Sequence, residues 1–418
     1  MAAALFLGRQ PRKERTELKN TAAIPSGREN NFPIVRLTAA IFVFIGHMGD
    51  ITGSFTPLVS GNPIHEIGVG MLFLMSGYLI TKSWLSDPHP LRYLVRRFLR
   101  LWPPFAVMIL LMVYVAGPLL SSYGIEGYFH HREFGLYLTN LRLLIAYTLP
   151  GVFEHLPVTD SINGGLWTMP VEAGFYILTP IFLTVLRLTD KIGQKSPKTH
   201  KDTGNTRTSG TVRPAGNVRP ADAPHGERSF WIVAFLTIAA IAFDFYLRAC
   251  HAGGRLVFYR TELISAFHLG VFYLIGILFT YERVRKLLNI QVACVLMCLM
   301  FFSQVSAPPY QYLAMYLVFP YFVMSFVFIP NPRFYAVGRK LELSYGIYLY
   351  GFFFQQLALY FRGLNSWPLN YFQLLVVSAI PTVLAAALSY YLVEKPVMRF
   401  SRWLLEKLTP KSKQTAGK

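Results

Sequence analysis

Charged residues are scarce in this chain: they make up 15% of its 418 residues. A soluble protein carries about a quarter of its residues as Asp, Glu, Lys and Arg, so the composition excludes an ordinary soluble domain. Hydrophobic residues reach 53%, and they fall in successive blocks. Block after block approaches the ~17–25 residues that cross a bilayer as a helix. The sequence therefore predicts an integral membrane protein.

Acidic residues and cysteines are scarcer still. The chain has 21 Asp and Glu against 40 Lys and Arg, a net charge of +19. The basic residues form no single patch; they occupy short connections between apolar blocks, as membrane topology requires, so we expect no nucleic-acid partner. Cys250, Cys294 and Cys298 have neither the spacing nor the polar setting of a metal site or a disulfide framework, and we expect no metal.

Ten apolar blocks satisfy the length criterion for a membrane-spanning helix. They are residues 33–55, 66–85, 102–121, 167–187, 229–249, 263–281, 288–303, 311–329, 341–361 and 371–393. The sequence thus predicts an all-α, polytopic membrane domain over residues 31–400. A basic arm precedes it at 1–30, a disordered linker interrupts it at 190–228, and a basic interfacial tail follows at 401–418.

A shorter apolar segment, residues 136–150, has three interpretations: a further crossing, a re-entrant segment or an interfacial helix. If it does not cross, 31 of the 40 Lys and Arg residues lie on one side of the membrane and six on the other. A full crossing would scramble this segregation. The positive-inside rule therefore favours ten crossings with both termini in the cytoplasm.

The first apolar block contains two basic side chains, in RLTAAIFVFIGHMGD at 36–50. Arg36 and His47 are about three helical turns apart, so they share one helix face and are separated by ~16 Å along its axis. Burial without a carboxylate partner keeps an imidazole neutral, and neutral imidazole is a good general base. A histidine that only fixes helix packing is the alternative, but ionisable residues inside a membrane are functional by default.

Three further features stand out in the apolar blocks. Arg97 and Arg100, in RRFLRLWPP at 96–104, share a helix face and suit phosphate oxygens, although positive-inside anchoring explains them equally well. Ser76 and the glycine after it favour close helix packing or line a cavity. Glu172 lies about one turn inside the fourth block, where a carboxylate needs a histidine, an arginine or a hydroxylated substrate as partner.

Assembled in order, these segments resemble the acyltransferase-3 family of bacterial membrane O-acyltransferases. The matching elements are Arg36 and His47 at their spacing, FLMSGYLI at 73–80, RRFLRLWPP at 96–104, LWTMPVEAGFY at 166–176, ELSYGIYLYGF at 342–352 and YYLVEKPVMRF at 390–400. No single element is specific, but six in this order are. Thr168 and Met169 stand where the family usually has Ser and Leu; the replacements keep size and polarity, and bear on substrate choice more than on activity.

The resemblance implies transfer of an acyl group, with acetyl expected, from a coenzyme A thioester to a sugar hydroxyl of a cell-surface or secreted glycan, in the bacterial inner membrane. His47 would be the general base, and Glu172 would orient it or hold the sugar. The resemblance assigns acyl-CoA binding to Arg36, Ser76, Arg97 and Arg100. Candidate acceptor-side residues are Asp50, Trp167, Arg260, Glu262, His268 and Tyr345.

The expected partners are acyl-CoA as donor substrate, a sugar or lipid-linked glycan as acceptor, and the lipid bilayer, with no tightly bound cofactor. A proton-coupled transporter or flippase of a lipid-linked or acidic substrate is the competing hypothesis, with His47, Glu172 and His268 as a proton relay. Transporter folds often contain an internal repeat with paired broken helices. The Arg-X10-His pattern does not recur in the later half of the chain, which favours the enzyme.

Overall fold

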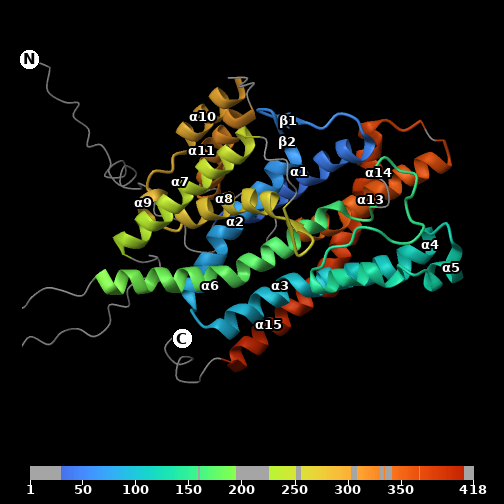
Figure 1. Ribbon diagram of the computed structural model, residues 1–418, viewed down its shortest axis with the longest axis horizontal. Coiled ribbons are helices and arrows are strands. Elements are labelled where there is room, and N and C mark those ends of the chain that lie inside the picture. Colours follow the sequence, from blue (N-terminus) through green and yellow to red (C-terminus); the bar gives the residue numbers. More distant parts are fainter. Residues whose placement is uncertain are drawn as a thin grey trace, which may run out of the picture.

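Figure 1 shows the computed structural model of the chain, which describes residues 30–158, 161–193, 226–250, 256–302, 308–329, 334, 341–366 and 368–408. Helices dominate these residues. The only strands among them form two short antiparallel hairpins, β1 (Leu58–Val59) with β2 (Asn62–Pro63) and β3 (Val257–Phe258) with β4 (Thr261–Glu262). The prediction of a helical fold is confirmed, apart from these hairpins.

Each of the ten predicted spans contains a helix. They are α1 (Phe32–Thr52), α2 (Ile64–Ser86), α3 (Pro90–Leu111), α6 (Thr168–Gly193), α7 (Glu227–Ala249), α8 (Leu263–Leu278), α10 (Ile290–Phe302), α11 (Pro308–Val327), α13 (Ser344–Leu364) and α14 (Tyr371–Ser389). By length and composition, 6 helices of the described chain are able to cross a membrane. A multi-pass membrane protein is therefore supported, while the count of ten and the cytoplasmic termini stay predictions.

Two helices extend beyond their predicted spans. α3 begins at Pro90 and continues through η2 (Met112–Ala116) and α4 (Gly117–Leu120), so RRFLRLWPP lies inside the helix. α14 continues through η5 (Tyr390–Glu394) and α15 (Lys395–Leu408), giving a helix of 38 residues. At ~1.5 Å per residue, it exceeds the ~30 Å hydrocarbon core. Residues 401–408, expected in an interfacial tail, thus continue this helix, and α15 packs against α3.

The apolar segment 136–150 forms no spanning helix. Its first part is a 3-10 helix, η3 (Phe134–Arg142). Trp102 Nε1 of α3 donates a hydrogen bond to the Leu141 carbonyl at 3.1 Å, whereas Ser121 Oγ, beyond the end of α4, donates to the Pro150 carbonyl at 2.8 Å. Along a continuous helix, Trp102 and Ser121 are ~28 Å apart. The segment therefore runs along α3 and back, which fits the re-entrant interpretation.

Close helix crossings hold the centre of the bundle together. α1 packs against α2 and α13, and α2 packs against α8. A Cβ atom at Gly77 of α2 would lie 2.1 Å from the Tyr273 carbonyl oxygen of α8, so only glycine fits there. The predicted close packing at this position is confirmed.

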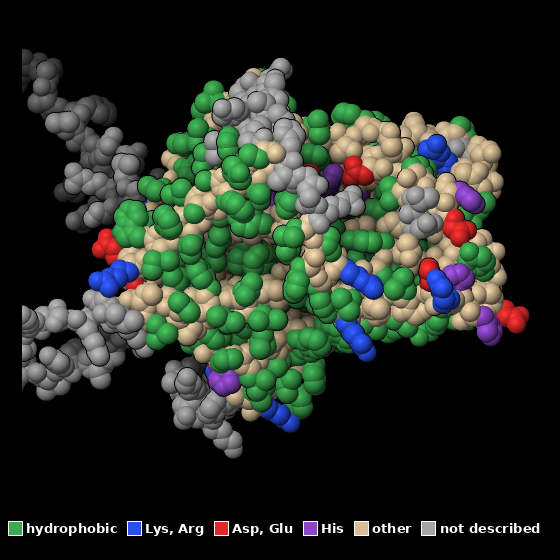
Figure 2. All heavy atoms as spheres, in the orientation of Figure 1, with side chains coloured by type: hydrophobic (Ala, Val, Ile, Leu, Met, Phe, Trp, Pro, Cys, Tyr) green, Lys and Arg blue, Asp and Glu red, His purple; other side chains and the backbone are tan. Residues whose placement is uncertain are grey.

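The surface has the character of a membrane protein. Figure 2 shows hydrophobic side chains over most of the middle of the molecule, with charged side chains mainly toward its ends. Exposed apolar side chains include Phe235, Leu299, Phe302, Phe372 and Leu392. Soluble monomers rarely expose apolar patches this extensive, whereas a lipid-facing surface requires them.

The basic arm before residue 30, residues 194–225 of the expected linker and residues 409–418 lie outside the described residues. The helices on both sides extend into the expected linker, α6 to Gly193 and α7 from Glu227. The Asp190 carboxylate of α6 accepts hydrogen bonds from the backbone N–H groups of Gly226 at 2.9 Å and Ser229 at 3.1 Å. A carboxylate at a helix N-terminus is favourable, so Asp190 fixes the start of α7.

Candidate active site

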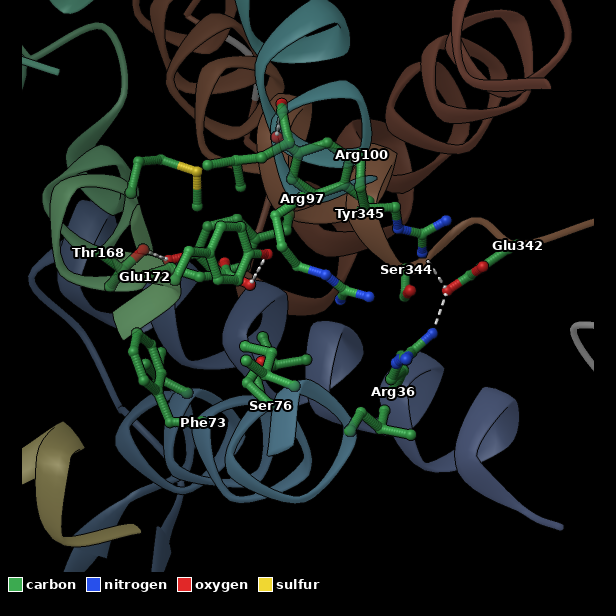
Figure 3. Close-up of a pocket in the computed structure, with 18 residues that line it drawn as sticks. Arg36, Phe73, Ser76, Arg97, Arg100, Thr168, Glu172, Glu342, Ser344 and Tyr345 are labelled. Carbon is green, nitrogen blue, oxygen red and sulfur yellow. Dashed lines mark hydrogen bonds and ion pairs between the residues drawn. The ribbon is translucent and has the colours of Figure 1, made fainter. Parts of the chain in front are cut away.

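Three of the predicted arginines converge on one cavity, which we call the arginine pocket (Figure 3). Arg36 comes from α1, and Arg97 and Arg100 come from one face of α3. The cavity, of about 130 Å³, is also lined by Ser76, Thr168, Glu172, Tyr176, Glu342, Tyr345 and Tyr348. The structure thus brings together all four residues expected to bind acyl-CoA.

Glu342, just before α13, is the counter-ion of the arginine pocket. Its Oε1 accepts hydrogen bonds from Arg36 Nη1 at 2.7 Å and from Arg100 Nη2 at 2.8 Å. Burial raises the pKa of Glu342, but the charges of Arg100 and Arg36 outweigh it and lower the pKa from 4.5 to about 2. The sequence reasoning missed this residue, although it is the only acid in the quoted motif ELSYGIYLYGF.

We expect Glu342→Gln to lower the free energy of unfolding by about 3 kcal/mol at neutral pH, because Arg36 and Arg100 lose their counter-charge in a largely buried site. A carboxyl whose pKa is depressed by folding stabilises the protein above its unfolded pKa, and that stabilisation is lost as the pH falls toward the folded value. The difference between wild type and variant in denaturant unfolding should therefore shrink between pH 4.5 and about 2.

The matched control is Glu133→Gln, since Glu133 forms only an exposed pair with Arg132 at 3.9 Å. Exposed pairs contribute ~0–1 kcal/mol, so this variant should unfold like the wild type. If Glu342→Gln lowers the free energy of unfolding by the same amount at every pH down to 2, the role of the ion pair is contradicted.

Glu172 lies in the arginine pocket and not beside His47. Its Oε1 accepts a hydrogen bond from Tyr176 at 2.6 Å, one helical turn along α6. Arg97 donates to Ser83 Oγ at 2.9 Å and faces the same cavity. The expected partners of Glu172 were a histidine, an arginine or a hydroxylated substrate, and the structure places arginines in the same pocket. The carboxylate next to His47 is that of Asp50.

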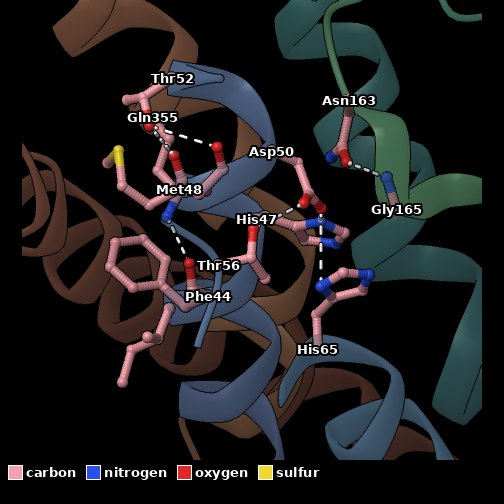
Figure 4. Close-up of polar contacts among 12 residues, drawn as sticks. Phe44, His47, Met48, Asp50, Thr52, Thr56, His65, Asn163, Gly165 and Gln355 are labelled. Atoms are coloured by element: carbon pink, nitrogen blue, oxygen red, sulfur yellow. Dashed lines mark hydrogen bonds and ion pairs between the residues drawn. The ribbon is translucent and has the colours of Figure 1, made fainter. Parts of the chain in front are cut away.

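His47, Asp50 and His65 form what we call the histidine cluster (Figure 4). The rings of His47 and His65 stack with centroids 5.2 Å apart. Asp50 Oδ2 lies 3.7 Å from His47 Nδ1 and 3.5 Å from His65 Nδ1. A Cβ at Gly46 would lie 2.6 Å from His65 Cβ, so glycine there permits the close approach of α1 and α2.

The histidine cluster corrects one expectation. An imidazole without a carboxylate partner was expected, but Asp50, three residues along α1, is that partner. The side chain of His47 is 17% exposed and that of Asp50 is 42% exposed, so the cluster is not enclosed by apolar side chains. His65 was missed by the sequence reasoning; its signal is a polar His-Glu pair at the start of an apolar block.

The other ring nitrogen of His47 faces the short 3-10 helix η4 (Gly164–Trp167). A Cβ on Gly165 would lie 3.8 Å from His47 Nε2 and 3.8 Å from the Tyr348 hydroxyl. The distance between His47 Nε2 and the Tyr348 hydroxyl is therefore at most twice 3.8 Å. Asn163 fixes the turn: its Nδ2 donates to the Leu349 carbonyl at 2.7 Å, and its Oδ1 accepts from Gly165 N at 3.2 Å. Because Tyr348 also lines the arginine pocket, Gly165 lies close to both that pocket and His47.

This arrangement orients His47 for proton transfer. Nδ1 is the nitrogen beside Asp50, and Nε2 is the nitrogen toward Gly165 and Tyr348. A carboxylate at one ring nitrogen favours the tautomer whose opposite nitrogen accepts a proton, and it stabilises the imidazolium that forms. The geometry is therefore suited to general-base chemistry at Nε2.

His268 belongs to a separate buried cluster between α7, α8 and α11. The Asp244 carboxylate accepts hydrogen bonds from Arg248 Nε at 2.8 Å and from the Tyr316 hydroxyl at 2.7 Å. His268 Nδ1 lies 3.5 Å from Asp244 Oδ2 and also hydrogen-bonds Tyr316. Asp244 has no exposed side-chain area. The histidine, glutamate and second histidine of the hypothetical proton relay thus lie in three different clusters.

We expect Asp244→Ala to destabilise the protein by about 3 kcal/mol, because it leaves the half-buried Arg248 charge and the buried Tyr316 hydroxyl without their shared acceptor. Thermal unfolding in detergent micelles measures the effect. Glu126→Ala, in the exposed helix α5 (Gly124–His130), is the control and should leave the unfolding temperature unchanged. An unchanged temperature for Asp244→Ala would show that the cluster contributes little to stability.

The remaining candidate residues lie apart from the histidine cluster or at its edge. Arg260 and Glu262 are on the exposed hairpin β3–β4, where Arg260 Nη1 donates to Thr139 Oγ1 at 3.4 Å and Glu262 accepts from Ser265 Oγ at 2.8 Å. Trp167 ends η4, two residues after Gly165. Tyr345 lines the arginine pocket, and its hydroxyl donates to the Leu101 carbonyl at 2.7 Å.

Comparison with known proteins identifies the family of the chain. A family model described as an acyltransferase domain, of the acyltransferase-3 type, matches residues 30–391. Nodulation protein 10 of Rhizobium leguminosarum bv. viciae is 26% identical over 90% of this chain and 94% of its own length. An O-acetyl transferase of Shigella phage Sf6 is 23% identical over 88% of this chain and 96% of its own length. No solved structure matches. The chain therefore belongs to the acyltransferase-3 family and is a membrane O-acyltransferase.

Proposed function

We propose that the protein transfers an acetyl group from acetyl-CoA to a hydroxyl group of a sugar in a cell-surface or secreted glycan, with His47 as the general base. The observation that carries this proposal is the position of His47 Nε2, next to Gly165 and within reach of the arginine pocket. The name of the phage relative, O-acetyl transferase, favours acetyl as the transferred group.

The donor enters at the end of the molecule where Arg36, Arg97 and Arg100 converge. Its phosphates stay at these guanidinium groups, which are suited to phosphate oxygens. The pantetheine arm then extends through the arginine pocket toward Gly165. The ~16 Å between Arg36 and His47 along α1 matches an extended arm, so the thioester carbonyl comes to rest beside His47 Nε2.

The acceptor hydroxyl approaches His47 from the opposite side, where Asp50 and His65 leave the cluster partly exposed. His47 Nε2 takes the hydroxyl proton as the sugar oxygen bonds to the thioester carbonyl carbon. The carbon–sulfur bond then breaks, and the imidazolium returns the proton to the departing thiolate. Asp50 stabilises the imidazolium, so Glu172 is assigned to binding substrate in the arginine pocket.

The basic connections set the orientation of this reaction in the bacterial inner membrane. The arginine pocket faces the cytoplasm, which supplies acetyl-CoA, and both termini lie on that side. The histidine cluster then faces the outer side, where the glycan is modified. This assignment explains why the acidic and titratable groups beside His47 are partly exposed although α1 is apolar.

The test uses the purified full chain in lipid nanodiscs, with acetyl-CoA labelled in the acetyl group and with glycolipids extracted from bacterial membranes. We expect label in the glycan fraction and one free thiol per transferred acetyl group. The same preparation given labelled free acetate is the control and should transfer nothing. Movement of glycolipid across vesicle membranes without release of thiol would instead support the transporter.

A further inference from the structure

The arginine pocket adjoins a wider cavity between α3 and α15, which we call the basic vestibule. Its volume is about 720 Å³, and it shares Arg36, Arg97, Arg100 and Glu342 with the arginine pocket. The two cavities therefore adjoin at these residues. The vestibule adds further basic side chains from both helices: Arg96, Lys395, Arg399 and Arg402.

Most of the α3 cations in this region already have an acidic partner. Arg100 pairs with Glu342 at 2.8 Å, and Arg96 pairs with Asp87 at 2.8 Å. Asp87 lies in the connection between α2 and α3, where a hydrogen bond from Arg92 and the nearby Arg96 lower its pKa to about 2 in spite of burial. Asp87 therefore remains charged and neutralises this side of the vestibule.

Lys395, Arg399 and Arg402 differ from the α3 cations. They are spaced by four and three residues on α15, so they form one stripe along a helix face, and all three line the vestibule. Among the carboxylates of the described chain, none lies within ion-pair distance of these three side chains. Three like charges on one stripe repel one another, which an anion between them would relieve.

We propose that this stripe on α15 binds the 3′-phosphate of the coenzyme A donor. The inference rests on the proposed function and deepens it. When the thioester lies at His47, the diphosphate reaches the level of Arg36, ~16 Å away along α1. The adenosine and its 3′-phosphate then lie beyond the arginine pocket, in the vestibule. A phosphate dianion is complementary to uncompensated guanidinium and ammonium groups.

An anionic lipid headgroup presents the same phosphate chemistry, so the experiment must separate the two sources. The probes are coenzyme A and dephospho-coenzyme A, which lacks only the 3′-phosphate, bound to the full chain in nanodiscs of neutral phosphatidylcholine. The variant is Lys395→Gln/Arg399→Gln/Arg402→Gln. The control, Arg283→Gln/Lys286→Gln/Lys407→Gln, removes the same charge from exposed positions that do not line the vestibule.

We expect the wild type and the control to bind coenzyme A about tenfold more tightly than dephospho-coenzyme A, as expected for a few partly exposed charge pairs. The α15 variant should bind both ligands with the affinity that the wild type has for dephospho-coenzyme A. The inference is overturned if the wild type binds coenzyme A and dephospho-coenzyme A equally tightly. It is also overturned if the control loses its preference for coenzyme A as the α15 variant does.

Three further outcomes separate this inference from a lipid site and from the proposed function. If the α15 variant keeps its preference for coenzyme A but loses phosphatidylglycerol that copurifies with the wild type, the stripe is a lipid site and the inference fails. If the wild type transfers acetyl groups equally well from acetyl-CoA and from its dephospho analogue, the phosphate assignment fails while the proposed function stands. A wild type that releases no thiol from acetyl-CoA contradicts the proposed function itself.

Discussion

Replacement of His47 by alanine is expected to lower kcat for acetyl transfer about 10³-fold, within the ~10²–10⁴ that general-base catalysis contributes. The reason is the geometry of the ring: Asp50 is beside Nδ1, and Nε2 faces Gly165 and Tyr348. KM for acetyl-CoA should change little, because the proposed phosphate site at Arg36 is three helical turns away. Initial rates of thiol release at several acetyl-CoA concentrations separate the two constants.

His155→Ala is the matched control, because His155 is an exposed histidine in the loop before η4. Both variants should unfold like the wild type, so that lost activity is not lost structure. A His47→Ala enzyme whose kcat stays within about threefold of the wild type would exclude His47 as the base. A rise in KM at constant kcat would instead make His47 a binding residue.

The second large effect is expected at Gly165. A side chain there would lie close to both His47 Nε2 and the Tyr348 hydroxyl, each 3.8 Å from the position of a Cβ. The first carbon fits without a clash, so Gly165→Ala should fold normally, whereas Gly165→Leu fills the space that the thioester needs. We expect Gly165→Leu to reduce kcat/KM for acetyl-CoA about 10²-fold, since a small displacement of the reacting atoms has effects of that size.

Gly174→Leu is the control for this experiment, because a Cβ at Gly174 of α6 meets no atom within 4 Å. Binding of coenzyme A itself, measured at equilibrium, should be weakened much less than catalysis, since the phosphates are held at the far end of the donor. Wild-type kcat/KM in Gly165→Leu would show that the thioester does not pass this residue, and the route from the arginine pocket to His47 would have to be abandoned.

Under the proposed function, the arginine pocket would receive the donor and the histidine cluster would receive the acceptor. Arg36 and His47 are near opposite ends of α1, and the cavities of the described chain extend from α15 to Tyr348. Gly165 lies close both to His47 and to Tyr348, which lines the arginine pocket. His47, Glu172 and His268 lie in three different groups of contacts, which favours the enzyme over the transporter.

The elements of this fold were predictable from local sequence. Backbone polar groups must be satisfied within each segment in lipid, so long apolar blocks become helices, and each predicted span contains one. Helical periodicity likewise predicted that Arg97 and Arg100 share a face, and both line one pocket. The first and last residues of the helices were less predictable. α3, for example, begins at Pro90, because helix formation extends into the basic connection where no residue prevents it.

Contacts between distant segments were decided by the tertiary structure alone. Arg36 and Glu342 are 306 positions apart, and His65 meets His47 only because glycine lets α1 and α2 approach closely. The sequence by itself determined which helices form and which polar side chains each one carries, because periodicity and hydropathy are local properties. Which carboxylate faces which arginine or histidine depends on how the helices pack, and packing is a property of the whole chain.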